Sequence, residues 1–353
     1  MKNSLRYLIL IIFLCLNIIQ NTVANEPFVF NVTEIEILEN GNQVNGYKGG
    51  TVISEDGSKI IAENFYYNKL TNILEAEGSV KYVDDKKDTT ITSDKAIYLK
   101  NEEKIFTKGN SKVENEDNII TASDLEYDKI QNIYKAKENA IAKDYKKDAT
   151  LYADIITYFK KEEKFFTKGK TKALIEKKYT FNSENVSYFR NLNKISSQEK
   201  SSVEDDNGNI YTLDNFSYNI KRKLLKGKKV DVLAKVEKNK YDRYFFSEGF
   251  FNFKDKSHIA KETKIKTHKD IFDDKNHDPR LYGSSSYSDE KKTVVNNGLF
   301  TSCKINDNCP PWSIKAEKIT HDKIKKDMIY KNAILKIYDV PVLYFPKFFH
   351  PDP

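Results

Sequence analysis

Apolar and polar residues alternate along short segments that recur through most of the chain. Six segments end in a tyrosine, at spacings of 31, 29, 31, 30 and 30 residues. After each tyrosine, a short polar turn leads into a second apolar run. Alternation with period two is typical of β-strands, and neither segment of a unit is long enough for an ordinary helix. Each unit is therefore predicted to be a β-hairpin. The tyrosines are Tyr67, Tyr98, Tyr127, Tyr158, Tyr188 and Tyr218.

Each unit also carries a recurrent acid four residues before its tyrosine, as in Asp94 and Asp154, with Ser123 as the exception. Apolar residues stand two and seven positions before the tyrosine, and in an unbroken strand these two sets would face opposite sides. A bulge or corner near the acid would return both sets to one interior. The alternative is a strand with two buried faces.

Stacked hairpins of this kind predict an elongated all-β protein with a continuous apolar interior. The periodicity is compatible with a β-helix or with a long, folded-over antiparallel sheet. It does not distinguish between these two architectures.

Two segments resemble known families. The stretch Ile120–Asp144 (ITASDLEYDKIQNIYKAKENAIAKD) resembles the OstA-type repeat of lipopolysaccharide-transport proteins, although its Gly-Asn-Val element is degraded. The stretch Cys309–Pro353 resembles the junction region of the LPS-assembly protein family LptD, which leads into an outer-membrane barrel. The matching residues are Trp312, Ile314, Ala316, Pro341, Val342, Tyr344 and Pro346. Together the two resemblances cover roughly residues 45 to 353.

The resemblance implies a β-jellyroll of about six hairpin repeats. It divides the chain into a signal peptide (1–24), an OstA-like jellyroll (25–240) and a junction region (241–353) leading to a barrel that we expect this chain to lack. It also implies a non-enzymatic protein that binds lipopolysaccharide and passes it toward the outer membrane. The implied partners are a related periplasmic jellyroll bridge protein, joined by edge-strand pairing, and the barrel with its plug lipoprotein in a full-length form.

The lipid-binding groove is predicted at the apolar residues two positions before each tyrosine, because acyl chains need apolar walls. These residues are Phe65, Ala96, Leu125, Ile156, Val186 and Phe216. A closed, packed core is the competing interpretation. Near the C-terminus, seven apolar residues are expected to be poorly covered, since their natural partner would be the barrel. They are Val340, Val342, Leu343, Tyr344, Phe345, Phe348 and Phe349.

The N-terminus has the layout of a secretory signal. Lys2 and Arg6 precede an uncharged apolar run, and small residues then place the cleavage between Ala24 and Asn25. Export to the periplasm or the cell outer membrane follows from this interpretation. An uncleaved membrane anchor is the alternative, which would make the chain an inner-membrane-anchored jellyroll of the same pathway rather than a soluble one.

In an exported chain, Cys303 and Cys309 are predicted to form a disulfide. The LptD resemblance implies an alternative, in which one or both of these cysteines pair with cysteines of the barrel. The segment from His268 to Asp278 is the only histidine and carboxylate cluster, with His268, Asp270, Asp273, Asp274 and His277, and a solvated loop is favoured over a metal site.

The remaining composition favours binding over catalysis. The net charge of +7 is carried by 54 Lys (59 minus 5) and only five Arg, which favours a solvated basic surface over a nucleic-acid site. No phosphate-binding loop, nucleophile motif or cofactor motif is present in the sequence, so no cofactor and no catalytic residue are predicted. A secreted β-helix that acts as an adhesin or binds polysaccharide stays open as an alternative function.

Overall fold

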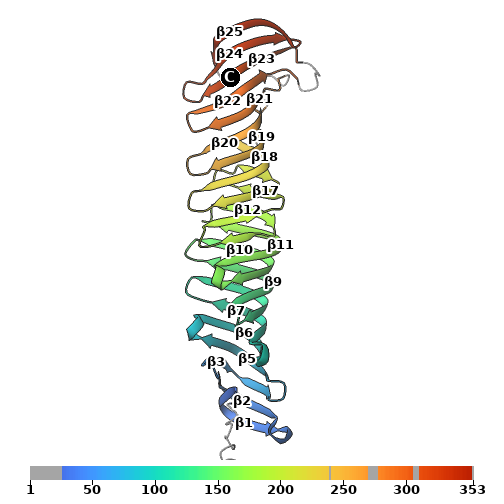
Figure 1. Cartoon of the computed structure of the whole chain (residues 1–353), viewed down its shortest axis with the longest axis vertical. Helices are drawn as coiled ribbons and strands as arrows, with labels where there is room; N and C mark the ends of the chain where they lie inside the picture. The colour runs from blue at the N-terminus through green and yellow to red at the C-terminus, as the bar shows by residue number, and fades with distance from the viewer. Residues whose placement is uncertain (1–25, 238–239, 269–276, 305–309, 352–353) are drawn as a thin grey trace, which may run out of the picture.

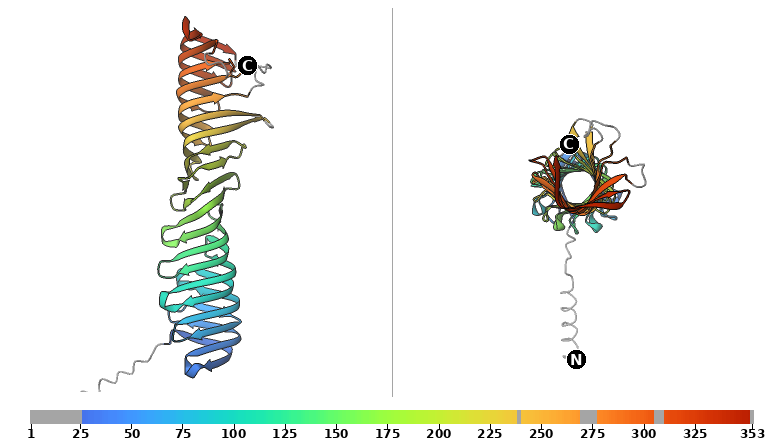
Figure 2. Two further views of the ribbon diagram at one scale, coloured as in Figure 1. Left: turned by 90° about the vertical axis from the view of Figure 1, so that its right-hand side faces the viewer. Right: turned by 90° about the horizontal axis from the view of Figure 1, so that it is seen from above.

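The strands of the protein stack one above another along a single long axis (Figure 1). The computed structural model describes residues 26–237, 240–268, 277–304 and 310–351. Within them, all strands belong to one antiparallel sheet, and consecutive strands are paired almost throughout. Viewed along the long axis, the strands surround that axis (Figure 2). The elongated antiparallel β-jellyroll is thus confirmed. The β-helix alternative is wrong, because the coils of a β-helix pair in parallel.

Most of the N-terminal strands are long, and two are divided. The N-terminal strands are β1 (Phe28–Leu38), β2 (Gln43–Ser54), β3 (Lys59–Ala62), β4 (Asn64–Asn68), β5 (Ile73–Asp84), β6 (Thr89–Leu99), β7 (Lys104–Glu114), β8 (Asn118–Asp128), β9 (Ile133–Asp144), β10 (Ala149–Phe159), β11 (Lys164–Ile175), β12 (Tyr179–Glu184) and β13 (Ser187–Phe189). The two divided strands are split into β3 and β4 and into β12 and β13.

The C-terminal strands continue the same sheet. They are β14 (Lys194–Ser197), β15 (Ser201–Glu204), β16 (Ile210–Leu213), β17 (Asn215–Asn219), β18 (Leu224–Glu237), β19 (Lys240–Asn252), β20 (Ser257–Lys266), β21 (Arg280–Ser288), β22 (Lys292–Thr301), β23 (Trp312–Asp322), β24 (Asp327–Ile337) and β25 (Val340–Pro351).

Helical structure in the described residues is confined to short 3-10 turns between strands. These turns are η1 (Glu39–Gly41), η2 (Asp85–Lys87), η3 (Lys100–Glu102) and η4 (Lys160–Glu162). No helix in the described part of the chain has the length and apolar character of a membrane span. The predicted signal peptide and its cleavage point between Ala24 and Asn25 lie outside the described residues.

The predicted corner is confirmed at the acid position of every unit. The strand pairing shifts by a β-bulge around Asp94, Ser123 and Asp154. In the other units, the strand is divided near the same position, as between β3 and β4 or between β16 and β17. A bulge bends the strand and increases its twist. Each strand therefore contributes one half to each of two facing walls.

Glycine is required where the neighbouring strand crosses the corner. Gly78 has a φ of +83°, and a Cβ at this position would lie 2.6 Å from the Glu63 carboxyl group. The segment Glu77–Val80 (EGSV), which is close to the Gly-Asn-Val element of the OstA-type repeat, thus lies within a strand, in β5, opposite the acid of the corner.

The bend buries both apolar sets in one interior. The residues seven positions before each tyrosine are buried, and so are all six tyrosines. These buried residues are Ile60, Ile91, Ile120, Leu151, Phe181 and Tyr211, with Tyr67, Tyr98, Tyr127, Tyr158, Tyr188 and Tyr218. The alternative of two buried faces is therefore wrong.

Aromatic rings stack along the interior from strand to strand. The ring centroids of Tyr127 and Tyr134 are 4.5 Å apart, and those of Tyr158 and Phe165 are 4.2 Å apart, with nearly parallel planes. The buried residues form one cluster from Phe28 to Ala260 and a second from Ile265 to Ala333. The domain boundary at residues 240 and 241 stays a prediction, and the sheet continues across it.

Candidate lipid-binding interior

The six predicted groove residues are all buried in the first core cluster. Phe65, Ala96, Leu125, Ile156, Val186 and Phe216 point inward together with the tyrosines. None of them lines the cavity described below. Their position agrees with an apolar interior, while their contact with lipid stays a prediction.

Two rows of turns border this interior. Side chains of one row contact the other row, and we call this line of contacts the seam. One row follows the tyrosines and includes Lys129. The other row holds the turns at the opposite strand ends and includes Asp56. Lys129 Nζ donates to Asp56 Oδ2 at 2.7 Å and pairs with Glu103 of its own row at 3.0 Å. The Lys129 side chain is only 2% exposed, so this ion pair is shielded from water on one side.

The charge of Asp56 is stabilised by this arrangement. Partial burial alone would raise the pKa of the carboxyl group, but hydrogen bonds from Lys129 and Ser58 lower it more strongly. The pKa of Asp56 therefore lies well below its ordinary value, and the carboxylate stays ionised across the physiological pH range.

Arg190 forms the most deeply buried contact of the seam. Its Nε donates to Asp144 Oδ2 at 2.7 Å, and its Nη2 donates to Asp117 Oδ2 at 3.2 Å. Tyr188 also donates its hydroxyl hydrogen to Asp144, at 2.8 Å. A buried carboxylate with several donors is well satisfied, so this point holds the two rows together firmly.

Further contacts extend the seam along the molecule. Lys160 Nζ donates to the backbone carbonyls of Lys87 and Asp88 in the opposite row, the latter at 2.8 Å. Burial lowers the pKa of Lys160, and the charges of Asp88 and Asp84 oppose this effect. Lys223 pairs with Glu176 at the C-terminal end.

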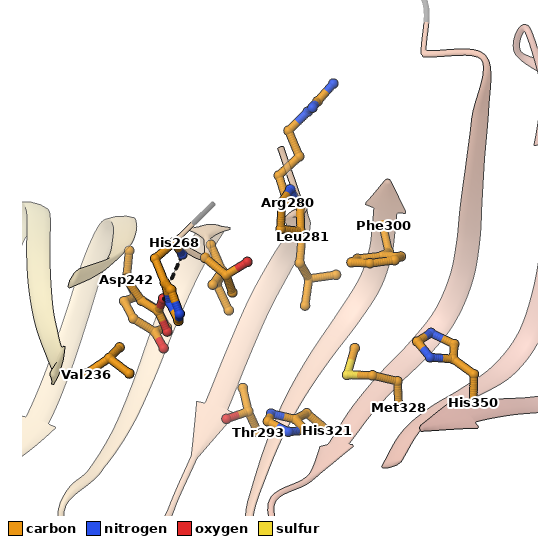
Figure 3. A pocket seen from close by; sticks show the side chains of 14 residues that line it. Val236, Asp242, His268, Arg280, Leu281, Thr293, Phe300, His321, Met328 and His350 are labelled. Atoms are coloured by element: carbon orange, nitrogen blue, oxygen red, sulfur yellow. Dashed lines mark hydrogen bonds and ion pairs between the residues drawn. The ribbon is translucent and has the colours of Figure 1, made fainter. Parts of the chain in front are cut away.

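A cavity of about 270 Å³ lies beyond the seam, in the C-terminal part of the jellyroll (Figure 3). Its apolar wall includes Tyr244, Ile265, Leu281, Phe300 and Met328. A water molecule occupies about 30 Å³ in the liquid, so the space can hold several methylene groups. Tyr244 packs against both core clusters, which places the cavity at their boundary.

The polar wall of the cavity centres on a histidine and a carboxylate. His268 Nδ1 lies 2.8 Å from Asp242 Oδ1, and the backbone N–H of His268 donates to the same oxygen (Figure 3). Burial, followed by the charge of Asp242, raises the pKa of Tyr244. Within the described residues, the Thr267 hydroxyl is buried without a hydrogen-bond partner. The wall can therefore bind a polar group of a ligand.

The other wall positions are tied into the fold. Arg280 points away from the other labelled side chains of the cavity and donates to the carbonyls of Asp278 and Cys303 (Figure 3). The Tyr330 hydroxyl lies 3.0 Å from His350 Nε2. These contacts fix the strands that enclose the space.

The described residues hold no group of three or more metal-ligating side chains in reach of one ion. Of the histidine and carboxylate cluster, Asp270, Asp273 and Asp274 lie outside the described residues. Cys309 is also outside them, so its predicted disulfide with Cys303 stays a prediction. The Cys303 thiol lies 3.6 Å from the carbonyl oxygen of Trp312.

The seam and the cavity were not anticipated from the sequence. A signal for the seam exists, because a basic residue stands two positions after five of the six tyrosines: Lys69, Lys100, Lys129, Lys160 and Arg190. The cavity has no comparable signal, since its residues come from strands β18 to β25 and from the segments next to β20 and β21, beyond the regular repeat.

Comparison with known proteins gives one family match. Residues 29–184 match the model of the OstA-like protein family. A search of curated proteins found no relative. Among solved structures, the chain is similar to LptH from Pseudomonas aeruginosa, described as the LptA homologous periplasmic component of the conserved lipopolysaccharide transport device.

The LptH similarity has 11% sequence identity and a TM-score of 0.20, and it covers 46% of this chain and 94% of LptH. The OstA-like family is not a family of enzymes, which confirms the expectation that the chain has no catalytic role. The resemblance to the OstA-type repeat is likewise confirmed over residues 29–184, which are less than half of the chain.

Proposed function

We propose that the protein is a periplasmic component of lipopolysaccharide transport that binds acyl chains inside its jellyroll and passes the lipid toward the outer membrane. The observation that carries this proposal is the cavity with an apolar wall at the boundary of the two core clusters. Burial of acyl chains contributes about 0.8 kcal/mol per methylene group, so such a space can hold lipid without catalysis. The OstA-like match over residues 29–184 supports the same pathway.

The two end strands support a role as one link in a longer assembly. β1 pairs only with β2 and β25 only with β24 among the described strands, so each leaves one edge unpaired. Both strands expose large apolar side chains, including Ile35 and Ile37 on β1 and Val340 and Tyr344 on β25. Unpaired edges of this kind bind further strands by β-augmentation. The proposed partners are a related jellyroll bridge protein at one end and an outer-membrane barrel, with its plug lipoprotein, at the other.

We further propose that, among the proteins of this pathway, the chain is of the LptD type. Its support is the C-terminal sequence resemblance, whose residues lie together at one end of the sheet. Trp312, Ile314 and Ala316 are on β23, and Pro341 to Pro346 are on β25, one strand beyond β24.

The test places a photo-crosslinking residue at Leu281, on the apolar wall of the cavity, and at the exposed control position Lys161. In cells that make lipopolysaccharide, labelling from position 281 and not from position 161 is expected. Equal labelling at both positions, or none from position 281 in a folded protein, would remove the acyl-chain site.

A further inference from the structure

The seam separates the predicted groove residues from solvent. Its contacts across the rows run from Lys69 with Glu26 to Lys223 with Glu176, and Ile156 and the stacked tyrosines lie in the interior bordered by these rows. The cavity is lined by residues from Val236 to His350, beyond the last of these contacts in the chain. A ligand could therefore occupy the cavity while the seam stays closed, but it could reach Ile156 from the side only through the seam.

The seam is built differently from the walls that it joins. In the described turns, backbone hydrogen bonds run along each row, as from Lys129 N to Glu103 O in one row and from Tyr145 N to Asp117 O in the other. The contacts across the seam are made by side chains, such as Lys129 and Arg190. The two rows can thus separate without the loss of any ladder hydrogen bond of the sheet.

The contacts across the seam differ in burial. Asp56 and Glu176 are partly exposed carboxylates, and ion pairs with exposed partners are weakened by water and salt. The Arg190 and Asp144 pair is almost fully buried and is expensive to break. Along the seam, the contact of Lys129 with Asp56 and that of Lys223 with Glu176 lie on either side of the contacts that Arg190 makes with Asp144 and Asp117. Separation is therefore easiest toward the two ends.

We propose that the seam is a lateral gate, which opens at its ion pairs to admit an acyl chain to the interior between Asp56 and Lys223. This inference rests on the proposed function, because it supplies the route by which the same ligand reaches the groove positions. Opening separates Lys129 from Asp56, and Lys160 from the carbonyls of Lys87 and Asp88, while Lys129 keeps Glu103 of its own row. These ammonium groups then face the phosphate groups of an anionic amphipathic lipid, which replace the carboxylate and carbonyl oxygens.

The test compares two crosslinking positions in the full chain. A photo-crosslinking residue at Ile156 reports entry through the gate, and one at Leu281 reports occupancy of the cavity. The gate is weakened by Asp56→Asn with Glu176→Gln, which remove the two partly exposed carboxylates. The matched control is Glu75→Gln with Glu77→Gln, which removes two carboxylates that pair with Lys95 at 2.7 and 2.8 Å away from the seam.

With lipopolysaccharide as the probe, the gate variant should increase the initial rate of labelling at position 156 by about threefold to tenfold. Labelling at position 281 should be unchanged, and the control variant should resemble the unmodified protein at both positions. Equal rates in all three proteins at position 156, with labelling retained at 281, would overturn the gate and leave the proposed function intact. An equal rise in the control would also overturn it. No labelling at either position would defeat the proposed function itself.

A salt series in the unmodified chain gives an independent measurement if the variants unfold. Higher ionic strength screens the exposed ion pairs, so labelling at position 156 should become faster and labelling at 281 should not. A lipid with the same acyl chains and no phosphate should label position 156 more weakly than lipopolysaccharide. No salt effect at position 156 would contradict the gate, and equal labelling by the two lipids would contradict the role of Lys129 and Lys160 in binding phosphate.

Discussion

Arg190 Nε lies 2.7 Å from Asp144 Oδ2, and the two side chains are 7% and 1% exposed. The two residues are 46 positions apart and belong to opposite rows of turns. Arg190→Met should lower the free energy of unfolding by roughly 3 kcal/mol, because it leaves a buried carboxylate without its cation. Urea denaturation measures this loss.

The control for Arg190→Met is Arg243→Met. Arg243 donates two hydrogen bonds to Asp231, but its side chain is 51% exposed. An exposed pair is worth about 1 kcal/mol or less, so the control should change stability little. Similar losses of unfolding free energy in both variants would contradict the idea that burial makes the Arg190–Asp144 pair more stabilising than an exposed pair.

A second prediction concerns Gly78, which faces Glu63 at a strand corner. Gly78→Ala should destabilise the protein by roughly 2 kcal/mol, since the new Cβ meets both a positive φ and the Glu63 carboxyl group. Gly57→Ala is the matched variant, because Gly57 has a φ of +88° and a Cβ added there would meet nothing within 4 Å. Its cost should be about 1 kcal/mol. Thermal unfolding of the two variants separates backbone strain from close contact, and equal shifts would show that Glu63 does not matter.

A third prediction concerns pH and His258. Burial, assisted by the positive charge of Lys323, lowers the pKa of His258 to about 4 from an ordinary value of 6.5. Between these two values, the unfolded chain binds a proton that the folded chain does not bind. Stability should therefore be full above pH 6.5 and fall as the pH drops toward 4, by on the order of 3 kcal/mol from this group.

The measurement is the urea midpoint as a function of pH in the unmodified protein and in His258→Gln. The variant should lose the part of the slope between pH 6.5 and 4, and the unmodified protein should keep it. Parallel curves would show that other groups cause the acid sensitivity.

The C-terminal edge strand makes a fourth prediction. Val340 and Val342 on β25 are exposed, whereas Phe345 packs against the second core cluster. Val340→Lys with Val342→Lys should reduce self-association in sedimentation experiments and change stability by no more than about 0.5 kcal/mol. Phe345→Ala should instead cost about 2 kcal/mol without affecting association. A strong loss of stability in the lysine variant would show that the exposed residues belong to the core.

Much of the jellyroll could be predicted because each unit repeats the same physical constraints. The tyrosine, the apolar residues around it and the acid between them are enough to predict the hairpins and the corner. The expectation of poor coverage near the C-terminus is confirmed for Val340, Val342, Leu343, Tyr344 and Phe349, which are exposed. It is wrong for Phe345 and Phe348, which pack against the second core cluster.

The closed seam and the cavity could not be predicted in the same way. Lys129 and Asp56 meet because the two rows of turns face each other, and the offset between rows depends on how far each strand tilts. The periodicity of one strand carries no information on that offset. The cavity arises where the repeat becomes irregular, so the packing of Tyr244 and Leu281 depends on particular side-chain shapes and not on a pattern.

Three contacts across the seam share one separation along the chain. Lys129 with Asp56, Lys160 with Lys87, and Arg190 with Asp117 are each 73 residues apart. A hairpin near the N-terminus thus completes its side-chain contacts only after about two further units of the chain have emerged. Long-range closure is slow compared with hairpin formation, so the emerging chain holds paired strands whose apolar sides are still uncovered. The order of folding is thereby set by the direction in which the chain emerges, and the newest part of the jellyroll needs protection from aggregation until the part that follows has arrived.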